Sequence, residues 1–224
     1  MERSALVAGA TGLVGRQVVQ RLLCDPAYTR VCVISRRPLD IAHPQLTTIV
    51  SDFSDLDALG ARLAADDVFC CLGTTLRAAG SRAAFIDVDL RMVVDLARAA
   101  RAAGAQQFLV ISAVGAGARA PAFYSRVKAR MEAAVAALGY AAVQILRPSL
   151  LLGEREEPRR DEALAQRFVA PWLAKLAQGP LQRYRPVSAD VVAETMLRLA
   201  LRSERGVHVH HLPLAEQQID ESVE

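Results

Sequence analysis

Short apolar runs and amphipathic segments alternate along this chain from its first residues onward. A short apolar run suits a buried strand, whereas apolar residues that recur every three or four positions suit a helix lying on a sheet. The runs that we interpret as strands are residues 5–8, 31–35, 46–50, 68–72, 108–111, 142–146 and 207–212. Helical periodicity marks residues 14–23, 56–64, 81–103, 124–138 and 191–201. The pattern therefore predicts an α/β protein in which strands and helices alternate.

Three glycines join the first predicted strand to the first predicted helix. Gly9 permits a tight turn, Gly12 lets the backbone approach a pyrophosphate, and Gly15 brings the helix close to the sheet. The unpaired N–H groups and the positive dipole end of the helix would then bind phosphates. The residues of this turn that we expect to bind a dinucleotide are Gly9, Thr11, Gly12, Leu13, Val14 and Gly15.

The surroundings of these glycines decide between two interpretations. A glycine-rich turn can also be purely structural, and so can a helix C-cap. Here a strand precedes the glycines, a helix follows them, and a second strand comes at the distance that a βαβ unit requires. The context therefore favours dinucleotide binding.

The end of the second predicted strand indicates which dinucleotide binds. It carries Ser35, Arg36 and Arg37 and no carboxylate. A site selective for NAD usually places an acidic side chain there, to bind both ribose hydroxyls. Two guanidinium groups suit a 2′-phosphate instead, because they bind it through charge-assisted and often bidentate hydrogen bonds. The sequence therefore predicts NADP(H), with a solvated pair of surface arginines as the alternative.

A loop of small residues follows the fourth predicted strand. In this architecture ligands bind outside the carboxyl ends of parallel strands. We therefore expect the loop backbone to line the ribose or the pyrophosphate of the cofactor. The residues concerned are Leu72, Gly73, Thr74 and Thr75.

Tyr124 and Lys128 carry the most specific chemical signal in the chain. Residues four apart face the same side of a helix, so the phenol and the ammonium group can share one site. The lysine cation is expected to lower the pKa of the phenol toward the working range. Ser112, which follows the fifth predicted strand, could hydrogen-bond the substrate oxygen whose charge changes. Alone, the tyrosine and the lysine could simply be a pair on a helix surface.

Together these motifs resemble the atypical and extended branches of the short-chain dehydrogenase/reductase superfamily, in particular the Tat-interacting-protein-like NADPH-binding oxidoreductases. The residues that carry the resemblance are 9–15, 35–37, 71–75, 124–128 and 146–148, with Ser112 twelve positions before the tyrosine. The resemblance implies a doubly wound parallel sheet, a Rossmann fold, with helices on both faces and a small C-terminal substrate lobe. It also implies a cofactor across the point where the strand order reverses.

The resemblance assigns further residues. Lys128 would also hold the nicotinamide ribose hydroxyls, and Asp52, followed by Phe53, would contact the adenine. Pro148 would wall the nicotinamide. From the residues alone, the aspartate could equally form a turn or a helix cap, and the proline could simply end a strand. Relatives often carry an asparagine where this chain has Asp89, which leaves that position without a secure role.

Length and composition set limits on the other possibilities. A chain of 224 residues is most simply one domain, residues 1–224, with residues 150–185 as a small substrate lobe or lid. A net charge of +3 is too small to indicate a nucleic-acid partner. The chain shows no leader segment, and no apolar run reaches the roughly 20 residues of a spanning helix. We therefore expect a cytoplasmic protein with no membrane partner.

The cysteines and histidines do not indicate a metal site. The four cysteines fall in apolar segments without the paired spacing of a zinc site, which suits a reducing compartment. His208 and His210 would share one face of a strand, but no carboxylate or cysteine pattern accompanies them. The sequence therefore predicts no metal.

The function that these residues favour is NADP(H)-dependent oxidation or reduction of a small molecule. Hydride would pass between the nicotinamide and a carbonyl or hydroxyl group, while Tyr124 supplies or takes the proton. One alternative is a regulatory or scaffold protein that binds NADP(H) with little catalysis. A nucleotide-sugar epimerase is a lesser alternative, because its substrate lobe is usually larger and the arginine pair disfavours NAD. The sequence leaves the substrate, the direction of the reaction and the oligomeric state open.

Overall fold

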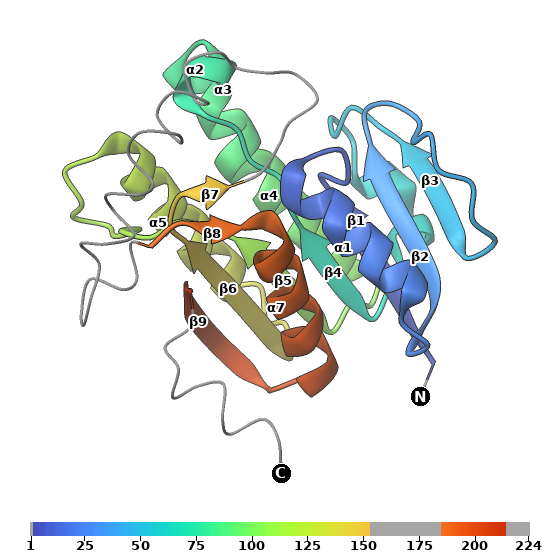
Figure 1. The fold of residues 1–224 in the computed structure, drawn as a ribbon. Coiled ribbons are helices and arrows are strands. Elements are labelled where there is room, and N and C mark those ends of the chain that lie inside the picture. The colour runs from blue at the N-terminus through green and yellow to red at the C-terminus, as the bar shows by residue number, and fades with distance from the viewer. Residues whose placement is uncertain (1, 153–184, 214–224) are drawn as a thin grey trace.

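The structure is a computed structural model that describes residues 2–152 and 185–213. A seven-stranded sheet runs through its centre, with helices on both faces (Figure 1). The strands are β1 (Arg3–Ala8), β2 (Tyr28–Ser35), β3 (Leu46–Val50), β4 (Asp67–Cys70), β5 (Gln107–Ile111), β6 (Ala142–Pro148) and β9 (Gly206–Leu212). All neighbouring strands in this sheet are parallel. Their order is β3-β2-β1-β4-β5-β6-β9, which reverses between β1 and β4 and confirms the predicted Rossmann fold.

Each face of the sheet has its own hydrophobic layer. On one face lie α1 (Leu13–Cys24) and α7 (Ala189–Arg202), packed against each other (Figure 1). On the other face lie α4 (Met92–Ala102), α5 (Phe123–Ala136) and a 3₁₀ segment, η1 (Asp57–Leu63). Both layers bury large apolar side chains completely, among them Leu22 on the first face and Phe108 on the second. The predicted amphipathic stripes therefore face the sheet, as their periodicity requires.

The first strands begin earlier than their apolar runs. β1 starts at Arg3 and β2 at Tyr28, although both residues are polar. Both bind the buried carboxylate of Asp67 at the start of β4: Arg3 Nε donates to it over 2.8 Å, and so does the Tyr28 hydroxyl. The strands extend because these polar groups satisfy one another, which an apolar pattern cannot reveal.

The helix predicted over residues 81–103 contains a change of helix type. It consists of α3 (Arg82–Ile86), the π-helical turn η2 (Asp87–Arg91) and α4. The Ser81 hydroxyl caps its start by accepting a hydrogen bond from the Ala84 amide. π-helical turns often mark functional sites, and this one places Asp89 inside the protein with 1% of its surface exposed.

The C-terminal half of the described chain adds a small second sheet. In it β7 (Leu151–Leu152) pairs with β8 (Val187–Ser188). The Ser188 hydroxyl caps α7 by accepting a hydrogen bond from the Val191 amide. Most of the lobe predicted over residues 150–185 lies outside the described residues, so the lobe and the one-domain division stay predictions. Within the described ranges, no helix has the length and apolar character needed to cross a membrane.

Candidate active site at the carboxyl edge of the sheet

The glycine turn between β1 and α1 leaves no space for side chains. Gly9 has a φ of +83°, which favours glycine, and a Cβ there would lie 2.5 Å from the carbonyl oxygen of Cys71. A Cβ on Gly15 would lie 2.1 Å from the Gly9 carbonyl oxygen. Backbone atoms therefore pack directly against Gly9 and Gly15. Thr11 and Gly12 lie on the surface, where a ligand can reach them. No side chain caps the start of α1, so its N–H groups are available to phosphates.

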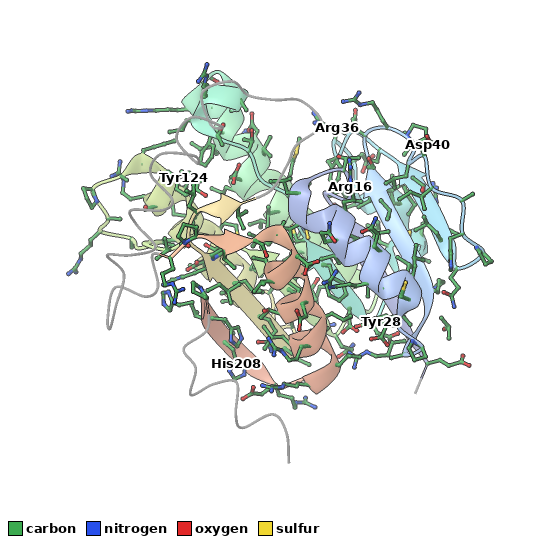
Figure 2. All side chains as sticks on the ribbon, viewed as in Figure 1. Arg16, Tyr28, Arg36, Asp40, Tyr124 and His208 are labelled. Carbon is green, nitrogen blue, oxygen red and sulfur yellow. The ribbon has the colours of Figure 1, made fainter. Side chains whose placement is uncertain are left out.

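The two arginines after β2 lie at the same edge. Arg36 and Arg37 are exposed, and neither pairs with a carboxylate among the described residues. Ser35 is buried, and its hydroxyl accepts a long hydrogen bond of 3.4 Å from the Arg37 amide. Figure 2 shows Arg36 near the start of α1, at the end of the molecule opposite Tyr28. This placement leaves both guanidinium groups available to an anion.

Asp52 and Phe53 follow β3. The Asp52 carboxylate accepts hydrogen bonds from both the amide and the hydroxyl of Ser54, which lower its pKa. Its side chain thus forms a turn, one of the two interpretations that the sequence left open. Phe53 has a φ of +67°, and its ring packs in the core. The part of Phe53 that can meet a ligand is therefore its backbone.

The small-residue loop after β4 is tied to Lys128 through Asp89. The amide of Thr74 donates to Asp89 Oδ2 over 2.8 Å, and Lys128 Nζ lies 2.8 Å from Asp89 Oδ1. Lys128 also donates to the Ile111 carbonyl oxygen over 3.3 Å. Burial lowers the pKa of Lys128, but the charge and the hydrogen bond of Asp89, together with the neighbouring Tyr124, raise it overall. The position of Asp89, which sequence reasoning left in doubt, is thus the link between the predicted cofactor loop and the predicted catalytic lysine.

Other residues of the loop also have local structural roles. Thr75 caps the short helix α2 (Leu76–Ala79) by accepting a hydrogen bond from Ala78. Leu72 packs against the core, and the α-carbon of Gly73 faces the Asp89–Lys128 pair. The loop is therefore held in place by the buried ion pair of Asp89 and Lys128.

Tyr124 is the second residue of α5, so the phenol stands near the start of that helix as predicted. Its ring packs against Phe85, with 5.4 Å between the ring centroids. No described residue hydrogen-bonds its hydroxyl. Figure 2 shows the side chain near the end of the molecule where the strands terminate.

The net pKa change predicted for Tyr124 is wrong in direction. Lys128 does lower the pKa of the phenol, but burial raises it by more, and the charge of Asp89 raises it further. The net effect is a pKa above the ordinary value of about 10. The main cause is burial of the phenol, and the charge of Asp89 adds to it by partly offsetting the lysine charge, which the sequence argument had treated as unpaired.

Ser112 stands just past β5, but its hydroxyl is already bonded. It donates to Glu132 Oε1 over 2.5 Å, and Glu132 in turn pairs with both Arg147 Nε and Arg147 Nη2, at 2.9 and 2.6 Å. Sequence reasoning missed Glu132. The signal was present, because Tyr124, Lys128 and Glu132 follow one another at intervals of four on one face of α5.

Two further predictions concern the neighbouring strands. Pro148 is buried and is the last residue of β6, so its role as a strand end is visible. At β9, His210 Nε2 lies 2.7 Å from Gln144 Oε1. In the part of the chain that the structure describes, no three His, Cys, Asp or Glu side chains are grouped to hold a metal ion.

Known proteins resemble this chain over most of its length. Residues 9–153 match a family model described as NAD(P)H-binding. The chain is 39% identical over 213 residues to the protein fmp52, mitochondrial, of Aspergillus clavatus, covering 92% of this chain and 90% of the relative. It is 35% identical over 170 residues to the protein HTATIP2 of Rattus norvegicus, covering 74% and 70%. The fungal relative is named as mitochondrial, and the cytoplasmic location of this chain stays a prediction.

Solved structures share the fold at low sequence identity. Uronate dehydrogenase from Agrobacterium tumefaciens superposes with a TM-score of 0.68 at 18% identity, covering 93% of this chain and 74% of that one. A UDP-N-acetylglucosamine 4-epimerase from Methanobrevibacter ruminantium M1 gives 0.67 at 17% identity, covering 98% and 80%. At such identities the likeness shows the Rossmann fold alone.

Proposed function

The chain belongs to the NAD(P)H-binding atypical short-chain dehydrogenase/reductases, and on that premise we propose that it is an NADP(H)-dependent oxidoreductase. It transfers hydride between the nicotinamide and a carbonyl or hydroxyl group of a small molecule. The observation that carries the proposal is the arrangement at the carboxyl edge of the sheet. There the phenol of Tyr124 and the buried Lys128 stand on α5, and Ser112, which follows β5, is bonded to Glu132 of the same helix.

The residues present suit a dinucleotide. The uncapped start of α1 offers N–H groups to the pyrophosphate, and the closed glycine turn allows a close approach. Arg36 and Arg37 are exposed and unpaired within the described residues, which supports a 2′-phosphate and hence NADP(H). Bound NADPH would supply the hydride for reduction.

The chain's own groups handle the proton. The Tyr124 phenol holds its proton at neutral pH and can donate it to the oxygen of a reacting carbonyl. Lys128 fixes the electrostatic surroundings of that phenol from one helical turn away, and Asp89 holds the lysine in place. In the reverse direction the phenolate accepts the proton of the substrate hydroxyl.

The proposal is tested by changing Tyr124 to Phe. Turnover should fall by about 10²- to 10⁴-fold, the usual contribution of a positioned acid, while the NADPH dissociation constant stays the same. Turnover is measured as deuterium transfer from C4-labelled NADPH to cyclohexanone, benzaldehyde and 9,10-phenanthrenequinone. Tyr140→Phe is the matched control, because the Tyr140 hydroxyl donates to the Ala97 carbonyl within the core. Equal turnover in the wild type and the Tyr124 variant would contradict the proposal.

A regulatory NADP(H)-binding protein is the second candidate. It is favoured by one observation: the polar groups of Ser112 and Lys128 are bonded to two side chains of the protein itself, Glu132 and Asp89. Such a protein would bind NADPH but transfer deuterium to none of the three carbonyl probes. The same experiment therefore separates the two candidates.

A further inference from the structure

The bond between Ser112 and Glu132 has a fixed direction. Glu132 Oε1 receives Ser112 Oγ at 2.5 Å and Arg147 Nε at 2.9 Å, and Oε2 receives Arg147 Nη2 at 2.6 Å. Both carboxylate oxygens therefore face guanidinium N–H groups and act as acceptors. A carboxylate that pairs with a guanidinium group in this way carries no hydrogen to donate. The hydrogen shared by serine and glutamate thus comes from the serine.

Burial keeps this arrangement in place. Ser112 is 3% exposed and Glu132 is 6% exposed, so water offers little competition for either group. The hydrogen bond to Glu132 raises the pKa of Arg147, which therefore stays charged. The Ser112 amide is also bonded, donating to the Leu146 carbonyl over 2.7 Å. Losing the serine–carboxylate bond would remove a charge-assisted interaction in a shielded place.

The consequence concerns the lone pairs of Ser112. A serine hydroxyl has one hydrogen and two lone pairs, and here the hydrogen is already used. Toward any ligand Ser112 can then only accept. A substrate hydroxyl can donate to it, whereas a carbonyl oxygen would meet it lone pair against lone pair.

We propose that Glu132 is a positioning residue that makes Ser112 a hydrogen-bond acceptor, so that the site recognises the hydroxyl form of its substrate in preference to the carbonyl form. This inference rests on the proposed function, because it places the reacting oxygen beside Ser112. It departs from the sequence-based expectation, in which Ser112 stabilises that oxygen by donating to it. The substrate class that fits is an alcohol. While Tyr124 is protonated, the alcohol hydroxyl donates to Ser112 and accepts from Tyr124, and it turns its hydrogen toward the phenolate once that group has ionised.

The test uses two inert probes that differ at the recognised oxygen. 1-Methylcyclohexanol has a hydroxyl group but no hydrogen on the carbinol carbon, so it cannot be oxidised. N-Methyl-2-piperidone has a carbonyl oxygen that only accepts, and NADPH does not reduce a lactam. Each probe is titrated into the protein saturated with NADPH, and the fluorescence of the bound cofactor is followed. The measured quantity is the ratio of the two dissociation constants.

Three variants show whether hydrogen-bond direction causes the preference. In Glu132→Gln the amide can donate to Ser112, which frees the serine hydrogen for the ligand, and the preference for the alcohol should fall by about tenfold. Arg147→Lys keeps the carboxylate charge, so the preference should persist even where the variant is less stable. Glu194→Gln makes the same chemical change on the exposed face of α7 and should leave the ratio unchanged.

The outcomes separate this inference from the proposed function. A wild-type preference for the alcohol that is lost in Glu132→Gln and kept in Arg147→Lys supports the inference. A preference for the lactam, an unchanged ratio in Glu132→Gln, or binding of neither probe to the NADPH complex would overturn it. Deuterium transfer in the wild type that depends on Tyr124 would still support the proposed function in those cases. Failure of NADPH to bind would overturn both.

Discussion

Asp89 holds two parts of the site with one carboxylate. One oxygen accepts the Thr74 amide of the loop after β4, and the other faces Lys128 on α5. Both charged groups are almost fully buried, at 1% and 3% exposure. Removing one partner of such a pair leaves an uncompensated charge in a poorly solvated place.

We therefore expect Asp89→Asn to lower the free energy of unfolding by about 3 kcal/mol. The asparagine keeps the shape of the side chain and an acceptor for Thr74, so the loss reports on the charge. Asp95→Asn removes the same charge from the exposed side of α4, where the carboxylate pairs with Arg98, and should cost less than about 1 kcal/mol. Urea unfolding of both variants measures the difference, and equal losses would contradict the argument.

The raised pKa of Tyr124 predicts a particular pH dependence. Because burial and Asp89 raise that pKa, the phenol is still protonated throughout the neutral range. Oxidation of an alcohol needs the phenolate, so its rate should rise about tenfold per pH unit from pH 7 to pH 9. Reduction needs the neutral phenol, so ionisation of Tyr124 should not lower the rate of reduction over the same pH range. Initial rates of cyclohexanol oxidation with NADP⁺ provide the measurement, and a plateau below pH 9 would contradict it.

At the level of elements, the contact between Gly15 of α1 and Gly9 at the end of β1 sets the geometry of the turn. A side chain at Gly15 would overlap backbone atoms, which cannot rotate away as a side chain can. We expect Gly15→Ala to destabilise the protein by about 3 kcal/mol and to weaken NADPH binding, since α1 would move off the sheet. Gly117→Ala is the control, because a Cβ there meets its nearest atoms at an ordinary 3.9 Å. Thermal unfolding with and without NADPH distinguishes the two variants.

The elements also show what a sequence can reveal about this protein. The glycine turn, the serine–arginine end of β2 and the Tyr124–Lys128 pair were predictable because each depends on spacing within one short segment. The bounds of β3 were predicted correctly, because the strand coincides with an apolar run that ends at a turn. Asp89 and Glu132 were not predictable as site residues, because their partners lie on other elements. Asp89 is buried because it lies in a π-helical turn, and Glu132 is held by its ion pair with Arg147 of β6. Neither feature can be predicted from the local sequence pattern.

On the scale of the whole molecule, every strand of the main sheet ends at the same edge. The glycine turn, the arginines after β2, the loop after β4 and Ser112 after β5 all follow carboxyl ends of parallel strands. The overall fold was predictable for this reason, since it needs only alternating elements and the resemblance to a family. The early starts of β1 and β2 were not, because they depend on polar contacts to Asp67 at the opposite edge.

A ligand that spans this edge should stabilise the molecule as one unit. At a concentration of 100 times its dissociation constant, NADPH would add about 2.7 kcal/mol, which is about 5–10 °C in melting temperature for a chain of this size. In Arg36→Ala the shift with NADPH should shrink toward the shift with NADH, because the 2′-phosphate loses a charged partner. Arg205→Ala, just before β9 at the opposite edge, should keep the full difference. An equal shift with both dinucleotides in the wild type would contradict NADP(H) preference.

The π-helical turn at residues 87–91 contains about one residue more than an α-helical turn, because its hydrogen bonds run from i to i+5. Deleting one position there would leave an ordinary α-helical turn, so α4 would stay in register and its inward row of Val93, Leu96 and Ala100 would still face the sheet. The position of Asp89 beside Lys128 would be lost, because the wider turn is what places it there. A chain shortened by one codon at this point would therefore keep its hydrophobic layer and lose the buried charge beside the lysine.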